Sequence, residues 1–292
     1  MEPAIYYPKT PIAFDGWTVE IIRISFGEIV MPIPFHAHGR ECYEFHYNAS
    51  GSGTMFMEDE RYDITPGSFY ITGPGVRHAQ LPRTDDPFHE YCINLSIHAD
   101  ADARERNDYL PNALESMRTF VCRDLESLSL LFTRLFTEYR QQRVGYEHCA
   151  KALLEEIVIA ALRNNRALPK PPRTKIAISG EEALVTDTQR SLYVDQYFLD
   201  NYADQSLKGL AKALSLSTRQ TQRLLNDYYG KSFSEKTLEA RMNMASLLLA
   251  ETQESISDIA YYAGYSSPAH FGYAFRSHYG MPASEYRKRA RP

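Results

Sequence analysis

The chain has 292 residues, of which 43% are hydrophobic and 24% are charged, and its formal net charge is −5. This composition excludes collagen-like, coiled-coil and largely disordered chains, and the length predicts about two domains. The charge is uneven, because residues 1–186 hold 19 Lys and Arg against 26 Asp and Glu, whereas residues 187–292 hold 13 against 11. We therefore expect an acidic part and a mildly basic part with different partners.

Neither export nor membrane insertion is predicted. The first 17 residues lack a basic segment followed by an apolar stretch, and runs such as Leu247–Ala250 are far shorter than the roughly 18 apolar residues of a membrane span. The cysteines form no CxxC pair; they are Cys42, Cys92, Cys122 and Cys149. We expect reduced thiols in a cytoplasmic protein with no membrane partner.

Residues 1–120 have the pattern of short β-strands. Runs rich in Val, Ile, Tyr and Phe alternate with Gly, Pro, Asn and Asp; these runs are Thr18–Ile24, Tyr43–Tyr47, Thr54–Met57 and Ser68–Thr72. Many short strands at regular spacing predict a sandwich or a small barrel.

The predicted β-domain carries a group of polar residues in two segments. His36 and His38 alternate along a strand and so face the same side, where His78 from a neighbouring strand could meet them. Such a nitrogen cluster suits a divalent metal, and polar groups at the mouth of a small barrel suit a small-molecule ligand. The residues expected at the ligand are His36, His38, Glu44, Arg77 and His78.

This arrangement resembles a cupin barrel, whose first motif is HxH followed by Glu and Gly and whose second motif ends in His. The matching segments are His36-Ala37-His38 with Glu44 and Gly51, and Pro74-Gly75-Val76-Arg77-His78. The resemblance implies a β-barrel over residues 1–120 that senses a small molecule. Polar groups mixed with Tyr and Phe suit an effector such as a sugar.

Residues 121–166 change to a helical period. Apolar residues recur at steps of three and four from Leu125 to Tyr139, and again from Leu153 to Leu162 after a break near Gly145. This pattern predicts a helical hairpin with an apolar stripe on each helix. Either the β-domain or the hairpin of a second chain covers the stripe, which makes the hairpin a candidate dimerisation element.

Residues 167–186 form a predicted linker. Pro169, Pro171 and Pro172 stand within four positions, and the segment has no apolar periodicity. Pro-rich composition favours an extended, semi-rigid spacer. The part beyond it, residues 187–292, is helical in pattern.

The C-terminal part contains an internal repeat. A shift of 50 residues aligns Ser217 with Ser267, Leu225 with Phe275 and Gly230 with Gly280, among other pairs. Each copy predicts a helix, a turn and a second helix, which a serine caps and a glycine ends. Ser257 and Asp258 are expected to start the first helix of the second copy, and Phe233–Glu251 is a predicted linker helix of roughly 25 Å.

The second helix of a helix-turn-helix unit shows polar side chains to the DNA groove opposite its apolar anchors. Leu224 and Leu225 are the expected anchors in the first copy, and Phe271 and Phe275 in the second. Arg and Gln can contact guanine and adenine edges through two hydrogen bonds. The residues expected at DNA are Thr218, Arg219, Gln222 and Arg223 in the first copy and Ala269, His270, Tyr273 and Arg276 in the second.

The stretch from Asp187 to Arg287 closely resembles the DNA-binding domain of the AraC/XylS-type transcription regulators. The resemblance rests on Arg241-x-x-x-Ala245 leading into Leu248-Leu249, then Ile259-Ala260, Gly264-Tyr265, Phe271-x-x-x-Phe275, Gly280-x-Pro282 and Tyr286-Arg287. It implies sequence-specific binding of double-stranded DNA by two helix-turn-helix units, and recruitment of RNA polymerase by an activator.

Three positions depart from the family pattern. Thr221 stands where the family has a large apolar residue, and Pro268 supplies no backbone donor. Gly272 weakens the second recognition helix by about 1 kcal/mol relative to Ala. Base reading is therefore expected to depend mainly on the first unit.

The family resemblance implies an organic effector rather than a metal, because sensor cupins of these regulators keep the histidines while binding an organic molecule. In metal-binding cupins the Glu follows the second His by four or five residues, whereas Glu44 follows His38 by six and Glu41 by three. We therefore predict no metal and no cofactor. The alternative is a metal-dependent cupin enzyme in which His36, His38 and His78 hold one metal, with a fused autoregulatory DNA-binding domain.

The sequence as a whole predicts a multidomain α+β protein. A cupin-like β-barrel (1–120) with a helical hairpin (121–166) is joined by a linker (167–186) to an all-α domain (187–292) with two helix-turn-helix units and a linker helix. We predict a homodimeric, effector-responsive transcription regulator of carbohydrate or small-molecule metabolism genes, and not an enzyme.

Overall fold

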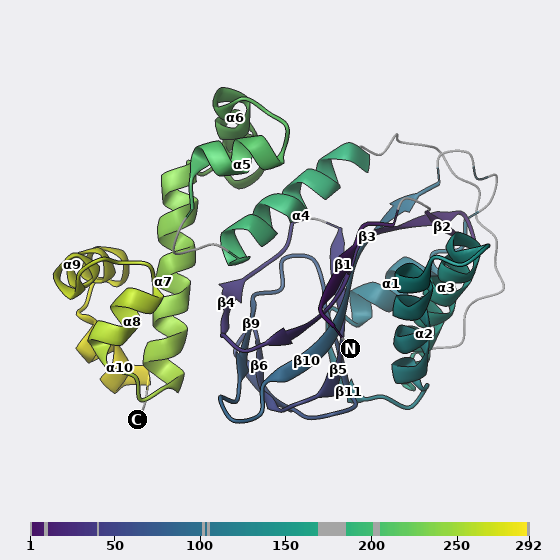
Figure 1. Cartoon of the computed structure of the whole chain (residues 1–292), viewed down its shortest axis with the longest axis horizontal. Coiled ribbons are helices and arrows are strands. Elements are labelled where there is room, and N and C mark those ends of the chain that lie inside the picture. The colour runs from purple at the N-terminus through teal and green to yellow at the C-terminus, as the bar shows by residue number, and fades with distance from the viewer. Residues whose placement is uncertain are drawn as a thin grey trace. The chain divides into compact units, whose positions relative to one another are not determined.

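The structure is a computed structural model that describes residues 2–8, 11–39, 41–100, 103, 106–168, 185–200 and 205–290. The chain divides into two compact units, which are Met1–Met31 with Ala37–Thr188, and Pro32–His36 with Gln189–Pro292. The strands and helices α1–α3 come from the N-terminal part of the chain, and helices α4–α10 from the C-terminal part (Figure 1). The predicted linker falls almost wholly outside the described residues.

Seven strands form one sheet in the order β1-β3-β10-β5-β8-β11, with β2 paired to β3. They are β1 (Ala4–Tyr6), β2 (Ile12–Phe14), β3 (Trp17–Ile29), β5 (Cys42–Ser50), β8 (Ser68–Thr72), β10 (Phe88–Ala99) and β11 (Thr119–Arg123). A second sheet has the order β4-β9-β6-β7. Its strands are β4 (Ile33–His36), β6 (Gly53–Met57), β7 (Glu60–Ile64) and β9 (His78–Pro82). The predicted α+β class is confirmed, but the strands form two sheets rather than one closed barrel.

The larger sheet has an apolar face because apolar residues alternate with polar ones along its strands. The register places Ile93 of β10 opposite both Ile24 and Phe45, and Phe45 opposite Ile71 of β8. These four side chains are buried in one hydrophobic core with α1 (Tyr109–Ser116), α2 (Leu128–Gln141) and α3 (Tyr146–Asn164). The sequence pattern allows the helical stripe to be covered either by the β-domain or by the hairpin of a second chain. This core shows that the chain's own β-domain covers it.

The packing of α2 on the larger sheet is aromatic. The ring of Phe132 stacks on that of Tyr91 with centroids 5.1 Å apart, and Phe136 lies 5.1 Å from the same ring. Both phenylalanines are fully buried, and each buried side chain of this size contributes about 1.5–3 kcal/mol. The stripe is therefore a structural core of the first unit.

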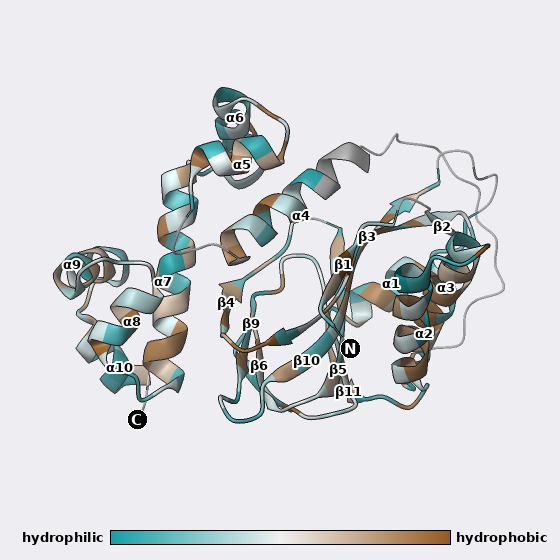
Figure 2. Cartoon of the chain, in the orientation of Figure 1, coloured by the Kyte–Doolittle hydropathy of each residue, from teal (hydrophilic) through white to brown (hydrophobic). Residues whose placement is uncertain are grey.

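The second unit contains two small helical cores that share α7 (Phe233–Glu251). The other helices are α4 (Val185–Asp200), α5 (Leu207–Ala213), α6 (Thr218–Tyr229), α8 (Ile256–Tyr262), α9 (Pro268–Tyr279) and α10 (Ala283–Ala290). Phe233 packs with α4, α5 and α6, whereas Met242 and Leu249 pack with α8, α9 and α10. Figure 2 shows α7 mostly hydrophilic in its first half and mostly hydrophobic in its second.

The helix ends follow the predicted capping residues, with one difference. Ser217 caps α6 and Ser267 caps α9, and Gly230 and Gly280 end these helices in the left-handed conformation. The predicted start of α8 at Ser257 was one residue late, because the helix begins at Ile256 and Ser255 caps it by accepting the hydrogen bond from Asp258 N–H. Among the described residues, no helix has both the length and the apolar character to cross a bilayer.

Candidate functional site

The face of the larger sheet that is turned away from α2 and α3 is polar and buried. Because side chains alternate along a strand, Glu44 and His46 of β5 lie on this face, opposite to Phe45. The register aligns Asn94, Glu44 and Thr72 in one row across three strands, and Cys92, His46 and Tyr70 in the next. All of these except Cys92 are at most 5% exposed, so the interior of the β-domain holds ionisable groups away from water.

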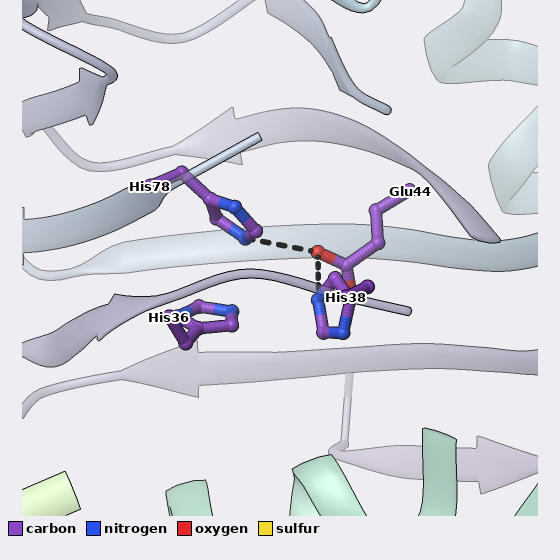
Figure 3. Close-up of side chains that lie close together, drawn as sticks. All are labelled: His36, His38, Glu44 and His78. Atoms are coloured by element: carbon purple, nitrogen blue, oxygen red, sulfur yellow. Dashed lines mark ion pairs between the residues drawn. The ribbon is translucent and has the colours of Figure 1, made fainter. Parts of the chain in front are cut away.

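Glu44 lies at the centre of the buried group. Its Oε2 is 2.9 Å from His38 Nε2, 3.2 Å from His78 Nε2 and 3.3 Å from His46 Nε2. Figure 3 shows the rings of His38 and His78 reaching the same carboxylate oxygen from two sides. The other oxygen, Oε1, accepts a hydrogen bond from Asn94 Nδ2, and Thr72 Oγ1 donates to Oε2.

The two sequence segments that supply these histidines are fixed to each other by the backbone. Gly75 N–H donates to the carbonyl of His38 over 3.0 Å. Gly75 has φ +72°, a left-handed conformation that glycine adopts without strain. The turn before β9 thereby brings His78 next to His38.

A second buried carboxylate, Glu90 of β10, extends the group. Glu90 Oε1 lies 2.9 Å from His46 Nδ1, and Glu90 Oε2 accepts hydrogen bonds from Tyr70 Oη and Gln80 Nε2. The rings of His46 and Tyr70 stack 4.6 Å apart. His46 therefore bridges two carboxylates through its two nitrogens.

Burial and charge shift the protonation of these groups in different directions. Burial opposes ionisation of Glu44, but the charge of His38 and hydrogen bonds from His38, His46 and His78 hold the pKa of Glu44 well below its usual value. Burial also opposes a charge on His46, yet the Glu90 carboxylate raises the pKa of His46 well above its usual value. For His78 burial prevails and lowers the pKa. Burial and the neighbouring charges therefore favour an ionised Glu44 and a charged His46, and they disfavour a charge on His78.

The structure brings together four of the five residues predicted at the effector site. The ligand atoms of His36, His38, Glu44 and His78 all lie within 4.8 Å of one another. His36 is half-buried, and its Nδ1 lies 2.8 Å from the carbonyl of Pro34. Arg77 is exposed and its side chain is not part of this group, so its role stays a prediction.

Sequence reasoning missed the outer members of the group, which are His46, Tyr70, Thr72, Gln80, Glu90 and Asn94. The alternation of β5 could have indicated His46, because it lies two residues after Glu44 on the same face. Asn94 and Thr72 depend on the register between strands that are distant in sequence. No local pattern predicts that register.

In the first helix-turn-helix unit, the predicted DNA-contacting residues lie on the first turns of α6. Thr218, Arg219 and Arg223 are exposed, and Arg223 pairs with Asp227 over 3.5 Å. Gln222 is half-buried, and its Oε1 accepts a hydrogen bond of 3.4 Å from Phe233 N–H. Leu225 anchors the opposite face and is fully buried.

Thr221 replaces the family's large apolar residue at low cost. It is fully buried, and its hydroxyl donates to the carbonyl of Ser217 over 3.0 Å. Ser217 and Gln220 form a capping box at the start of the same helix. The bond to the Ser217 carbonyl satisfies the hydroxyl that the buried threonine brings into the unit, and the capping box stabilises the helix start.

In the second unit, the predicted residues lie on one exposed face of α9. Ala269, His270 and Arg276 are exposed, and Tyr273 is 78% exposed. Phe271 and Phe275 are fully buried on the other face. Each unit thus presents a helix with an exposed polar face and a buried apolar face, which is the form that inserts into a DNA groove.

Comparisons with known proteins match both parts of the chain. Residues 30–158 match the AraC-like ligand binding domain family, and residues 210–289 match the helix-turn-helix domain family. The HTH-type transcriptional activator RhaR of Mannheimia succiniciproducens is 23% identical over 263 residues, which cover 88% of each chain. The lactose operon transcription activator of Staphylococcus xylosus is 22% identical over 244 residues, 83% of this chain and 82% of that protein.

A solved structure matches about a third of the chain. It is a transcriptional regulator from Chromobacterium violaceum of the AraC-type DNA-binding domain-containing proteins, 31% identical, with a TM-score of 0.32. The match covers 34% of this chain and 88% of that one. These families and relatives are transcription regulators rather than enzymes, which confirms the prediction that the chain is no enzyme. The chain has an AraC-like ligand binding domain and a helix-turn-helix domain, and its relatives are HTH-type transcription regulators.

Proposed function

We propose that the chain is an effector-responsive, sequence-specific regulator that reads DNA with α6 and α9 and binds a small polar molecule at the buried group around Glu44. The observation that carries the proposal is the polar interior of the β-domain. A domain that needed only stability would fill this space with apolar side chains, because buried charges cost free energy unless they are paired. Here Glu44, His38 and His78 are kept buried instead.

The chemistry of the group favours a ligand rich in hydroxyl groups. Carboxylates accept hydrogen bonds from hydroxyls, and imidazole and amide nitrogens can donate to hydroxyl oxygens. The lactose operon transcription activator is one of the relatives, which supports a sugar as the first effector class to test and genes of carbohydrate metabolism as the target class.

Dimerisation and contact with RNA polymerase belong to the same proposal. The inner stripe of the hairpin is buried within the chain, so a dimer formed through the hairpin must use its outer face, where Leu130 is 59% exposed. Sedimentation of the full chain at micromolar concentration, with and without operator DNA, is expected to show a dimer. A monomer under both conditions would refute this part of the proposal.

The experiment for the effector measures DNA affinity in the presence of candidate sugars. An effector changes DNA affinity only if it binds one state of the protein better than another. We expect one sugar class to shift the Kd for operator DNA at least fivefold in wild type and not in Glu44→Gln. No shift with any sugar in a protein that binds one operator specifically would refute the carbohydrate assignment.

A further inference from the structure

The geometry around Glu44 points to a metal site, and we propose that His38, Glu44 and His78, with His36 beside them, bind a divalent first-row transition metal ion. The prediction from the sequence was no metal. It rested on the unusual spacing between His38 and Glu44 and on the resemblance to organic-effector sensors. The arrangement of the side chains leads to a different conclusion.

The distances between the ligand atoms fit a shared metal ion. Glu44 Oε2 lies 2.9 Å from His38 Nε2 and 3.2 Å from His78 Nε2. Nitrogen and oxygen ligands lie about 2.0–2.2 Å from a zinc ion, so two neighbouring ligands are separated by about 3.0–3.4 Å for angles between those of octahedral and tetrahedral coordination. The observed separations are close to the edges of such a coordination shell.

The backbone determines which nitrogen of the His36 and His78 rings carries the hydrogen. His78 Nδ1 lies 2.9 Å from the carbonyl of Val76, and His36 Nδ1 lies 2.8 Å from that of Pro34. A carbonyl only accepts, so each Nδ1 carries the hydrogen, and a neutral ring then presents the lone pair of Nε2. Metal-binding histidines commonly have their other nitrogen fixed in this way.

In His78 the Nε2 atom faces the Glu44 carboxylate. Nε2 lies 3.2 Å from Glu44 Oε2, a distance that is bridged either by a proton that the ring donates to the carboxylate or by a cation that both atoms bind. A metal ion would replace that proton and use both atoms as ligands, so metal binding should release protons.

The spacing between His38 and Glu44 is compatible with a common site. Glu41, within the segment from His38 to Glu44, has φ +70°, a left-handed turn that takes up the additional length. The Glu41 carboxylate is directed elsewhere, 3.2 Å from His98 Nδ1. The Glu44 carboxylate therefore lies beside His38, although Glu44 follows His38 by six residues.

Neighbouring side chains hold the Glu44 carboxylate in place. Asn94 and Thr72 donate to its oxygens, and His46, fixed by Glu90, contacts it from β5. His46 is a positioning residue here, because both of its nitrogens already face carboxylates. Hydrogen bonds that orient a ligating carboxylate in this way typically change metal affinity 10–100-fold.

The donor set defines the class of ion. Imidazole nitrogens with one carboxylate suit Zn²⁺, Ni²⁺, Co²⁺ or Fe²⁺, whereas Mg²⁺ and Ca²⁺ prefer oxygen ligands. A six-coordinate ion held by these side chains would keep positions open for oxygens of a polar effector. The inference therefore rests on the proposed function for the location of the site, but its test measures metal occupancy rather than DNA binding.

The test is titration of metal-free, tag-free full-length protein with Co²⁺ and Zn²⁺, followed by calorimetry and by the visible absorption of bound Co²⁺. We expect one equivalent per chain with release of protons. Binding should weaken at least tenfold in Glu44→Gln and disappear in His38→Ala/His78→Ala. His46→Gln should retain the site with 10–100-fold weaker binding.

His89→Ala is the matched control, because His89 is a half-buried histidine of the same domain that lies outside the group; metal binding by this variant should equal that of wild type. Thermal melting of each metal-free variant identifies any that fail to fold. Wild type that binds no more metal than folded His38→Ala/His78→Ala would overturn the metal site. That result leaves the sugar experiment untouched, and a bound metal without any effect of sugars on DNA affinity would overturn only the proposed function.

Discussion

At the scale of single residues, we predict that the exposed cations of α6 carry base recognition. Arg219 and Arg223 lie one helical turn apart on the exposed face. Arg219→Ala and Arg223→Ala are each expected to cost about 1–3 kcal/mol of binding free energy on the preferred DNA site and to relax preference at one or two base pairs. Fluorescence anisotropy with the preferred duplex and its single-base variants measures both effects.

Arg163→Ala is the control for these variants, because Arg163 is an exposed cation on α3, outside the helix-turn-helix units. It should leave DNA affinity unchanged. If Arg219→Ala or Arg223→Ala weakened binding equally for all DNA sequences, the side chains would be phosphate contacts and base recognition by α6 would be wrong.

The four cysteines are free thiols in the structure and should differ in reactivity. Burial, with a smaller contribution from Asp124, raises the pKa of Cys122 to about 11. Because the thiolate is the nucleophile, Cys122 should react slowly at pH 8 and about tenfold faster per pH unit up to that pKa. Cys149 is exposed and should be alkylated first; mass spectrometry after timed iodoacetamide treatment checks the order, and equal rates would contradict it.

The site shows what a sequence can predict residue by residue. His36, His38, Glu44 and His78 were predicted, because period-two alternation and short motifs are local. Arg77 immediately precedes β9 and is exposed, whereas His78, the first residue of that strand, is buried. Glu90 and Asn94 were not predicted, because they reach Glu44 and His46 only through the pairing of β10 with β5.

At the scale of elements, the second recognition helix contains a correctable weakness. Gly272 lies within α9, and a Cβ there would meet no atom within 4 Å. Gly272→Ala should therefore raise the free energy of unfolding by about 0.5–1 kcal/mol. Chemical denaturation of the full chain measures this gain.

Gly209 of α5 is the matched comparison, because it is also a helical glycine but has no room for a Cβ atom. A Cβ at Gly209 would lie 2.6 Å from Tyr197 Oη and 2.9 Å from Ser206 Oγ, and these atoms hold the helix start. Gly209→Ala should lower stability despite its better helix propensity. If both variants were more stable than wild type, helix propensity rather than the space around the Cβ would determine the effect of these substitutions.

The core of the second unit depends on the buried face of α9. Phe275→Ala removes a fully buried ring that contacts Phe271, Tyr279 and Tyr286, and it should cost about 3–5 kcal/mol of unfolding free energy. DNA binding should be lost through unfolding, which a thermal melt detects. Tyr273→Ala, on the exposed face, should leave the melt unchanged; destabilisation of equal size would contradict the assignment of the two faces.

Elements with strong local patterns were predicted well. The capped helices α6 and α9 and the linker helix α7 were identified because capping serines, terminal glycines and apolar periods are short-range features. The helix α1 was missed; it has eight residues and no side-chain cap. The partner of the apolar stripe on α2 and α3 also remained open, because periodicity shows that a face is buried and not what covers it.

At the scale of the whole molecule, the chain combines a ligand-binding domain and a DNA-binding domain. Its two compact units are separated in sequence near Thr188, and the family matches fall on either side of that point. Coupling between the two units is a free-energy difference, and it is reciprocal. If an effector changes the affinity for DNA by a given factor, DNA must change the affinity for the effector by the same factor.

The most direct test of the central claim is selection of random duplex DNA by the full-length protein at about 150 mM salt, beside Arg219→Ala/Arg223→Ala. Two recognition helices on one rod predict enrichment of a single motif by wild type alone, with half-elements about one helical turn, roughly 34 Å, apart. Salt at this level suppresses non-specific phosphate binding. The same motif enriched by the double variant, or no motif enriched by folded wild type with and without effector, would contradict the account.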